Sequence, residues 1–340
     1  MPLISVVLPV YNVEAYVYDA IVSVLNQSIQ DFEIIVIDDC STDNTVSIIE
    51  SFKDTRIRII NKDTNKGLID SLNIGFKEAK GEYIARMDGD DINTPNRFEK
   101  QLQILQSNPK ISACGCWLQC FGVSHKMIKH KEFHHEIQAQ LLLSNPMSLG
   151  ATMLEREAYK NHEFDITKVH VEDYDFWART AWSNKMYNIQ EVLYHYRTRK
   201  TQVSSLHNTI QKKQDIRIKL CLYHKIDYDK AIFNDVLIEK LLFSKEAVTV
   251  NESRLFFQWM KALIRINKKQ DIFDSDELAK NLEILKRQFV FELFFTNNRK
   301  GIDYNLRKEI LVGLPIRKKL FVVLKKIKER VSFLRKQKNS

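Results

Sequence analysis

Three carboxylates within four residues, in the run Asp88-Gly89-Asp90-Asp91, are the clearest chemical feature of the sequence. The run directly follows an apolar segment, residues 83–85, that indicates a buried strand. In an open parallel sheet, ligands bind beyond the carboxyl ends of the strands. Crowded carboxylates repel one another unless they are solvated or hold a cation, and Mg²⁺ or Mn²⁺ commonly bridges carboxylates to substrate phosphates. The run therefore predicts a site for a divalent cation and a phosphate, with an acidic turn as the alternative interpretation.

Three weaker clusters are expected at the same edge of the sheet. Asp38 and Asp39 follow the apolar segment 33–37, and one carboxylate there suits a ribose hydroxyl or a base N–H. The first predicted strand ends in Pro9-Val10-Tyr11-Asn12, which can place an aromatic ring beside a base. The run Glu172–Trp177 lies at a predicted helix start. Each cluster alone also fits helix capping or a turn, but their joint order favours one ligand site.

Alternating strand and helix patterns supply the elements that must position these residues. The sequence predicts strands at 4–10, 33–37, 56–60 and 82–87, and helices at 13–27, 43–52 and 66–79. This alternation implies an α/β fold with a mostly parallel sheet covered by helices on both faces. The pattern loosens after residue 110, with short strands near 111–121, 148–154 and 185–198 and a helix from Val171. Beyond about residue 206 we expect helices.

Composition narrows the class of protein. The chain has 340 residues, of which 44% are hydrophobic and 28% charged, an ordinary globular composition. No apolar run approaches 18 residues, and no basic segment precedes the first apolar run, so we expect a cytoplasmic protein without a membrane span or signal peptide. Five cysteines without a secretory signal indicate reduced thiols. Cys114, Cys116 and Cys120 fit one face of a buried strand better than a zinc site, because no second ligand pair follows.

The net charge of +9 is concentrated at the C-terminus. Residues 315–340 hold ten Lys or Arg and one Glu, so the remainder of the chain is neutral. Apolar residues recur there at helical spacing from Ile316 to Leu334, which predicts a basic amphipathic helix on an anionic membrane. A helix packed on its own domain with a solvated basic face is the alternative. Nucleic acid would also attract this charge, but no recognised nucleic-acid module accompanies it, so we expect no nucleic-acid partner.

Taken together, the motifs resemble those of the family-two inverting glycosyltransferases, which have a GT-A fold. The likeness is nearest to the bacterial lipooligosaccharide N-acetylhexosaminyl and hexosyl transferases, and it covers roughly residues 3–205. The residues that carry it are Val7-Leu8-Pro9-Val10-Tyr11-Asn12, Ile37-Asp38-Asp39-Cys40-Ser41-Thr42-Asp43, Gly67-Leu68-Ile69-Asp70-Ser71-Leu72-Asn73-Ile74-Gly75, Gly81-Glu82-Tyr83-Ile84-Ala85-Arg86-Met87-Asp88-Gly89-Asp90-Asp91, Asn145-Pro146, Thr152-Met153, Glu172-Asp173-Tyr174-Asp175-Phe176-Trp177, Tyr196-Arg197 and Gln202-Val203-Ser204.

The resemblance implies a doubly wound, Rossmann-like GT-A sheet with a helical C-terminal extension. The catalytic domain would span 1–205, with a nucleotide-sugar half at about 1–110 and an acceptor half at about 111–205. A helical region at 206–314 and the basic tail at 315–340 would follow. The implied reaction is inverting transfer of GlcNAc, GalNAc, Gal or Glc from a UDP-sugar to a saccharide or lipid-linked saccharide. The product would be lipopolysaccharide, lipooligosaccharide or another surface polysaccharide, made at the inner face of the cytoplasmic membrane.

The resemblance also implies roles for individual residues. Asp173 would be the catalytic base, and a Mn²⁺ or Mg²⁺ ion would be held by Asp90, the main ligand, and Asp88. The residues implied to contact the nucleotide-sugar are Pro9, Tyr11, Asp39, Arg86, Asp88 and Arg199. The residues implied to support the site are Asp38, Asp91 and Glu172.

Two departures from the family pattern and two rival functions remain open. Arg199 stands where the family often has a His that helps to hold the metal or diphosphate, and Leu149-Gly150-Ala151 stands where a His tends to precede the Thr-Met strand. A nicotinamide-dependent oxidoreductase could use Asp38 as its ribose acid, but residues 11–15 after the first strand contain no Gly. A non-catalytic binding protein with a degenerate transferase fold is the other rival, and the intact carboxylate clusters argue against it.

Overall fold

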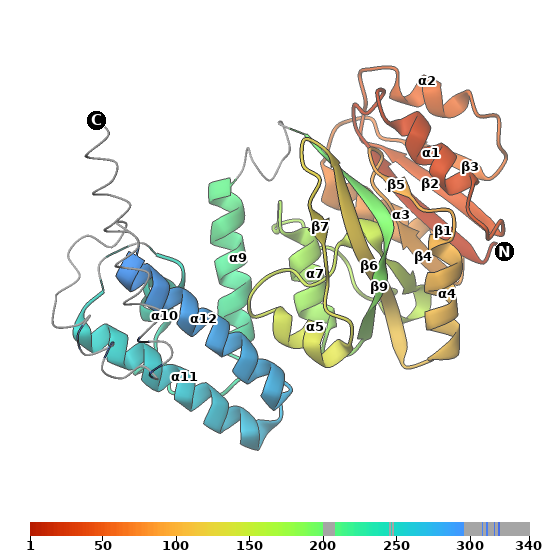
Figure 1. Ribbon diagram of the computed structural model, residues 1–340. Coiled ribbons are helices and arrows are strands. Elements are labelled where there is room, and N and C mark those ends of the chain that lie inside the picture. The colour runs from red at the N-terminus through yellow and green to blue at the C-terminus, as the bar shows by residue number, and fades with distance from the viewer. Residues whose placement is uncertain are drawn as a thin grey trace, which may run out of the picture. The chain divides into compact units, whose positions relative to one another are not determined.

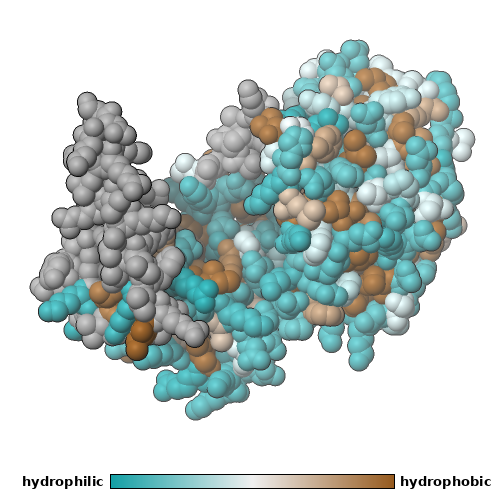
Figure 2. All heavy atoms as spheres, viewed as in Figure 1, coloured by the Kyte–Doolittle hydropathy of each residue, from teal (hydrophilic) through white to brown (hydrophobic). Residues whose placement is uncertain are grey.

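The computed structural model describes residues 1–199, 208–244, 246 and 248–295, together with the single residues 308, 311, 316 and 319. The chain divides into two compact units, Met1–Leu222 and Tyr223–Ser340. No described helix has the length and apolar character needed to cross a membrane. On the face of the first unit visible in Figure 2, hydrophilic residues predominate and hydrophobic ones are scattered.

Four parallel strands form the first half of the sheet (Figure 1). They are β1 (Ile4–Val10), β2 (Phe32–Asp38), β3 (Ile57–Asn61) and β4 (Tyr83–Arg86), in the order β3-β2-β1-β4. β1 is buried along its whole length, which explains its unbroken apolar run. Val10 pairs with Asp38, so the loops after β1 and β2 leave the sheet side by side.

Helices cover both faces of this half, as the alternating pattern predicts. They are α1 (Val17–Leu25), α2 (Thr45–Glu50) and α3 (Leu68–Glu78). Val7 packs in a cluster with Ile74 of α3, while its neighbours Val6 and Leu8 face a second, larger cluster that includes α1. α1 begins four residues later than predicted. Val13 belongs to the preceding loop, where its backbone N–H donates to the Thr45 hydroxyl at 2.9 Å.

The second half of the sheet mixes strand directions. It contains β5 (Ile92–Asn93), β6 (Ile111–Gly122), β7 (Met127–Ile128), β8 (Met153–Glu155) and β9 (Lys185–Thr198). β8 runs antiparallel to both β4 and β6, and β9 runs parallel to β6. The elements that surround these strands are α4 (Arg97–Ser107), α5 (His134–Gln140), the 3₁₀ turn Leu149–Ala151, α6 (Arg156–Tyr159) and α7 (Glu172–Thr180). Cys114, Cys116 and Cys120 are buried in β6 as free thiols, which confirms the strand prediction.

Helices make up the described residues after the sheet. They are α9 (Asn208–Tyr223), α10 (Asp235–Leu242), α11 (Val250–Gln270) and α12 (Ser275–Phe295). In the second unit, Phe256 of α11 packs on Phe289 of α12 with ring centroids 4.2 Å apart. The buried amide of Asn267 exchanges two hydrogen bonds with the backbone of Phe273, which fixes the turn between these helices.

The predicted fold class, a Rossmann-like α/β sheet with a helical C-terminal extension, is confirmed. The predicted domain limits at 205 and 314 stay predictions. The predicted amphipathic tail, 315–340, lies outside the described residues except for Ile316 and Lys319. The motif residues 202–204 also lie outside them.

Candidate active site

Hydrogen bonds connect the loops that follow β1 and β2 at the carboxyl edge of the sheet. The backbone N–H of Asn12 donates to the Ser41 hydroxyl at 3.0 Å, and the Asp38 carboxylate accepts the Ser41 N–H at 3.0 Å. Asn12 and Cys40 both adopt left-handed backbone conformations, with φ of 49° and 64°. These contacts fix the loop that presents Tyr11, whose side chain is 47% exposed. Pro9 lies one residue before the end of β1 and is buried. The Tyr11 ring is therefore available for stacking on a planar ligand.

Asp39 is buried and fully engaged by its own chain. Its carboxylate accepts the backbone N–H groups of Lys66 and Gly67 at 2.9 and 2.8 Å. The buried ammonium of Lys62 lies 2.6 Å from one Asp39 oxygen. Asp39 thus fixes the loop between β3 and α3. Its predicted role in holding uracil or ribose stays a prediction.

The turn after β4 begins with an ion pair between a buried arginine and a partly exposed aspartate. The Arg86 guanidinium is almost fully buried and pairs through Nη1 with Oδ2 of Asp88. The Asp88 N–H donates to the Tyr194 hydroxyl at 3.1 Å. A methyl group added to Gly150 would lie 2.6 Å from both Arg86 Nη1 and Asp88 Oδ2. Gly150 therefore allows the 3₁₀ turn to pack directly against the ion pair, at a position where a larger residue would force one of the charged groups to move.

Arginines also hold the other two carboxylates of the turn. Asp90 pairs with Arg199 at 2.7 Å between Oδ2 and Nη2. The buried carboxylate of Asp91 accepts the backbone N–H of Arg197 at 2.7 Å, and Arg197 Nε donates to the Asp90 carbonyl at 2.7 Å. The Arg197 guanidinium lies 4.5 Å from the centre of the Tyr16 ring. β9 and the residues that follow it thus set the position of the acidic turn.

Asp88 and Asp90 fit a divalent cation that takes its remaining ligands from elsewhere. Their side chains are 31% and 16% exposed, so oxygen atoms remain accessible. Among the described residues, no group of three or more His, Cys, Asp or Glu side chains is placed to hold a metal ion. Mg²⁺ is often bound by one or two carboxylates together with substrate phosphates and water. The two-carboxylate set matches that pattern, and Asp88 and Asp90 as metal ligands stay a prediction.

A buried arginine that could not be predicted from the sequence supports the acidic turn at residues 88–91. Arg97 of α4 is fully buried. Its Nη2 donates to the carbonyls of Arg86 and Thr152, both at 2.9 Å, and its Nη1 donates to Oδ1 of Asn93 at 2.5 Å. The guanidinium lies 5.1 Å from the centre of the Tyr194 ring. Because this one side chain contacts β4, β5 and β9 from α4, it fixes the positions of the elements that carry the acidic turn.

Asp173 lies at the start of α7, as the sequence predicts, and faces neutral partners. Its Oδ2 accepts the Asn145 side-chain amide at 2.6 Å, and its Oδ1 accepts the backbone N–H of Tyr174 at 2.7 Å. Burial raises the pKa of Asp173 above its ordinary value of 3.8. Burial, and next the charge of Asp173, raise the pKa of the neighbouring Glu172 to about 7.

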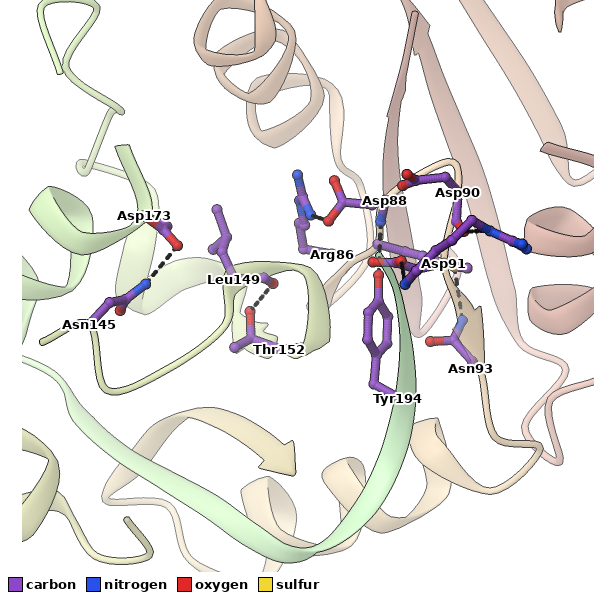
Figure 3. Close-up of polar contacts among 12 residues, drawn as sticks. Arg86, Asp88, Asp90, Asp91, Asn93, Asn145, Leu149, Thr152, Asp173 and Tyr194 are labelled. Atoms are coloured by element: carbon purple, nitrogen blue, oxygen red, sulfur yellow. Dashed lines mark hydrogen bonds and ion pairs between the residues drawn. The ribbon is translucent and has the colours of Figure 1, made fainter. Parts of the chain in front are cut away.

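Asp173 lies near enough to the acidic turn to be affected by the charges there. The charges of Arg86 and Asp88 act on the pKa values of both Glu172 and Asp173. In Figure 3, Asp88 and Asp90 lie together on one side, while Asp173 with Asn145 lies on the other, with Leu149 and Thr152 between them in this view. The structure therefore brings together two carboxylate clusters that are about 80 positions apart in the sequence.

Sequence reasoning gave no role to Arg97, Tyr194, Gly150 or Asn145. Arg97 lies on an amphipathic helix, where an arginine ordinarily faces solvent, so no sequence signal marks it as buried. In the sequence, Gly150 stands out only as part of a departure from the family pattern. Asn145 belongs to a motif, but its position beside Asp173 becomes apparent only in the fold.

Comparison with known proteins agrees with the geometry. A family model described as glycosyl transferase family 2 matches residues 5–180. An uncharacterized glycosyltransferase of Haemophilus influenzae is 33% identical over 313 residues, which cover 84% of this chain and 96% of that protein. The putative glycosyltransferase EpsE of Bacillus subtilis is 34% identical over 206 residues, which cover 58% of this chain and 73% of EpsE.

Solved structures share the fold. TarS 1-349 of S. aureus in complex with UDP-GlcNAc superposes with a TM-score of 0.57 at 17% identity, covering 92% of this chain and 93% of that one. The mannosyltransferase PcManGT from Pyrobaculum calidifontis, in complex with GDP-Man and Mn²⁺, gives a TM-score of 0.51 at 14% identity, covering 86% and 87%. With a family model over more than half of its residues and a relative matched along nearly its whole length, the chain belongs to glycosyl transferase family 2 and is a glycosyltransferase.

Proposed function

We propose that the enzyme transfers a hexose or N-acetylhexosamine from a UDP-sugar to a saccharide acceptor with inversion at the anomeric carbon. The observation that carries this proposal is the pairing of two unlike carboxylate environments in one site. Asp173 has neutral hydrogen-bond partners, a side-chain amide and a backbone N–H, whereas Asp88 and Asp90 are each paired with an arginine. One environment suits a proton acceptor and the other suits an anionic diphosphate.

The chemistry follows from these positions. An acceptor hydroxyl is a weak nucleophile, and Asp173 accepts its proton as the hydroxyl oxygen attacks the anomeric carbon. The bond to the diphosphate oxygen breaks in the same step, so no covalent enzyme intermediate forms. Arg86 and Arg199 provide positive charge beside the departing diphosphate. A divalent cation bound by Asp88 and Asp90 would supply further charge for the leaving group.

Neighbouring proteins support the choice of donor and product. TarS of S. aureus is seen with UDP and with UDP-GlcNAc. The putative teichuronic acid biosynthesis glycosyltransferase TuaG of Bacillus subtilis is 39% identical over 106 residues, 31% of this chain and 42% of TuaG. A UDP-sugar donor and a surface polysaccharide product, such as lipopolysaccharide or lipooligosaccharide, are therefore our proposals. The donor sugar would be GlcNAc, GalNAc, Gal or Glc.

A donor screen tests the proposal. The purified protein is incubated with UDP-GlcNAc, UDP-GalNAc, UDP-Gal or UDP-Glc and a divalent cation, and released UDP is measured with and without a crude glycolipid acceptor. We expect one donor to dominate and the acceptor to increase UDP release. If no UDP-sugar is turned over while a GDP-sugar is, the proposed donor class is wrong.

We propose further that the protein is cytoplasmic and that residues 315–340 bind the inner face of the membrane at its surface. The support is the concentration of the net charge in this segment together with its apolar stripe. Each Lys or Arg near an anionic surface contributes about 1 kcal/mol, less as salt rises. Deleting residues 315–340 should release the protein from anionic vesicles and leave turnover of a soluble acceptor unchanged. Vesicle binding that survives the deletion contradicts this proposal.

A further inference from the structure

A pocket of ≈ 330 Å³ opens beside Asp173. Most of its lining is polar, and those residues are Asn145, His170, Asp173, Gln211, Lys212 and Asp215. They come from the segment before the 3₁₀ turn, the start of α7 and the first half of α9. This volume is near the lower end for ligand pockets, about 300 to 1,000 Å³. The pocket therefore suits a small polar group placed directly against the candidate base.

The α9 wall lies in a part of the chain that the family model does not cover, since that model ends at residue 180. α9 is nevertheless attached to the loop that precedes α7 (Figure 1). Gln211 Nε2 donates to the His170 carbonyl at 3.1 Å, and Gln214 Nε2 donates to the Thr167 carbonyl at 3.2 Å. His170 itself adopts a left-handed backbone conformation with φ of 70°. Strained residues of this kind persist where surrounding contacts hold them, often beside binding sites.

The charged groups that line the pocket differ in their partners. Asp215 pairs with the buried ammonium of Lys219 at 2.6 Å. Asp173 is held by the Asn145 amide. Lys212 is exposed and makes no ion pair with any residue that the structure describes. Its ammonium group is therefore available to a bound molecule.

We infer that this pocket binds the sugar residue of the acceptor and that Lys212 is a specificity-determining contact to it. The inference rests on the proposed function, because it assigns the acceptor of the same reaction. Amide, carboxylate and ammonium groups together can donate to and accept from the several hydroxyls of a sugar ring. A sugar bound here presents a hydroxyl to Asp173, the group that removes the proton. α9 thereby supplies acceptor recognition that the nucleotide half of the sheet cannot provide.

The test compares two adjacent lysines of α9. Lys212 lines the pocket, whereas its neighbour Lys213 is also exposed but is not part of the lining. The variants Lys212→Met and Lys213→Met each remove one charge and keep a similar stem. Each full-length protein, saturated with UDP, is titrated by NMR with methyl β-glucoside, methyl β-galactoside and methyl N-acetyl-β-glucosaminide. We expect at least one glycoside to bind the wild-type protein, with affinity about tenfold lower in Lys212→Met because a charged hydrogen bond is lost.

The expected result includes unchanged glycoside binding in Lys213→Met and unchanged UDP affinity in both variants. The inference is overturned if no glycoside binds the UDP-saturated wild-type protein, or if the two variants lose affinity equally. Those outcomes leave the proposed function standing, because UDP binding and UDP-sugar turnover are measured separately. A wild-type protein that neither binds UDP nor releases it from any UDP-sugar contradicts the proposed function instead.

Discussion

The two carboxylate regions of the site differ in what surrounds them. After β4, Asp88 is paired with Arg86 and Asp90 with Arg199. At the start of α7, Asp173 accepts hydrogen bonds from a side-chain amide and a backbone N–H and has no ion pair among the described residues. Burial and the charge of Asp88 raise the pKa of Asp90 despite Arg199, and burial also raises the pKa of Asp173, so the two regions differ in their charged partners and not in the direction of the pKa shift. The same type of side chain therefore has two proposed roles: Asp88 and Asp90 bind cationic groups, and Asp173 accepts a proton.

The largest effect is expected from replacing Asp173, the carboxylate that has no ion pair among the described residues. Asp173→Asn keeps the shape of the side chain and abolishes its basicity, so transfer should fall by about 10²- to 10⁴-fold. UDP affinity should stay within about twofold, because Asp173 contacts the acceptor side. Steady-state kinetics and UDP titration measure the two quantities. Asp175→Asn, on the same helix but paired with Arg179 and outside the site, is the matched control. Near-normal transfer by Asp173→Asn would remove this residue from the mechanism.

The role of Asp88 and Asp90 is tested by removing the divalent metal ion. EDTA should greatly reduce transfer and added Mn²⁺ or Mg²⁺ should restore it, because Asp88 and Asp90 are predicted to bind metal beside a diphosphate. Arg199 already places positive charge at Asp90, so a residual metal-independent rate is expected. Arg199→His should lower that residual rate and increase the dependence on metal. Full activity in excess EDTA contradicts the metal prediction, and identical metal responses of both forms contradict the compensation by Arg199.

A smaller effect is expected from crowding the Arg86–Asp88 pair. Gly150→Ala places a methyl group 2.6 Å from each partner, so one of the two charged groups must move. Overpacking of this kind costs about 1–3 kcal/mol of folding stability, and the displacement of either charged group should also weaken UDP binding. Isothermal titration with UDP measures the loss, and the melting temperature reports on the fold. A variant that melts earlier but binds UDP normally would show that Gly150 serves stability alone.

The smallest effect is a shift in pH dependence. Asp173 must be ionised to act as a base, so activity is present above its pKa and is lost as pH falls through it. Since burial raises that pKa, the acid limb of kcat/KM should have its midpoint above 3.8. Glu172, with its pKa raised to about 7, is already protonated at that pH, so Glu172→Gln should leave the midpoint almost unchanged. A midpoint that stays at 3.8, or one that shifts markedly in the variant, contradicts this assignment.

Local sequence patterns were sufficient for the first half of the fold. β1 and β2 are buried on both faces, so their residues form continuous apolar runs that are easily recognised. The two-residue strands β5 and β7 were missed because their pairing partners are remote and their own sequences carry no pattern. The parallel pairing of β6 with β9 joins residues about 70 positions apart, which periodicity cannot show.

The acidic residues of the candidate site could be predicted from the sequence, but the residues that contact them could not. Asp88, Asp90 and Asp173 stand in acidic clusters at element ends, where solvation or ligand binding is expected. Their arrangement depends on Arg97 and Gly150, whose importance comes from packing between distant segments. A buried arginine resembles a surface arginine in sequence, because both fit an amphipathic helix.

The Arg97 side chain also has a consequence for motion. Its guanidinium donates to a carbonyl of β4, to the Thr152 carbonyl just before β8 and to a side chain of β5, so it can be released only if those segments separate together. Local opening beneath the acidic turn should therefore require opening of the sheet junction itself. Amide hydrogens of β4 and of the neighbouring end of β8 should exchange with solvent among the slowest in the first unit, as one cooperative group. The backbone of β4 beneath the acidic turn would then stay fixed during turnover. Any adjustment to a bound donor would be made by side chains.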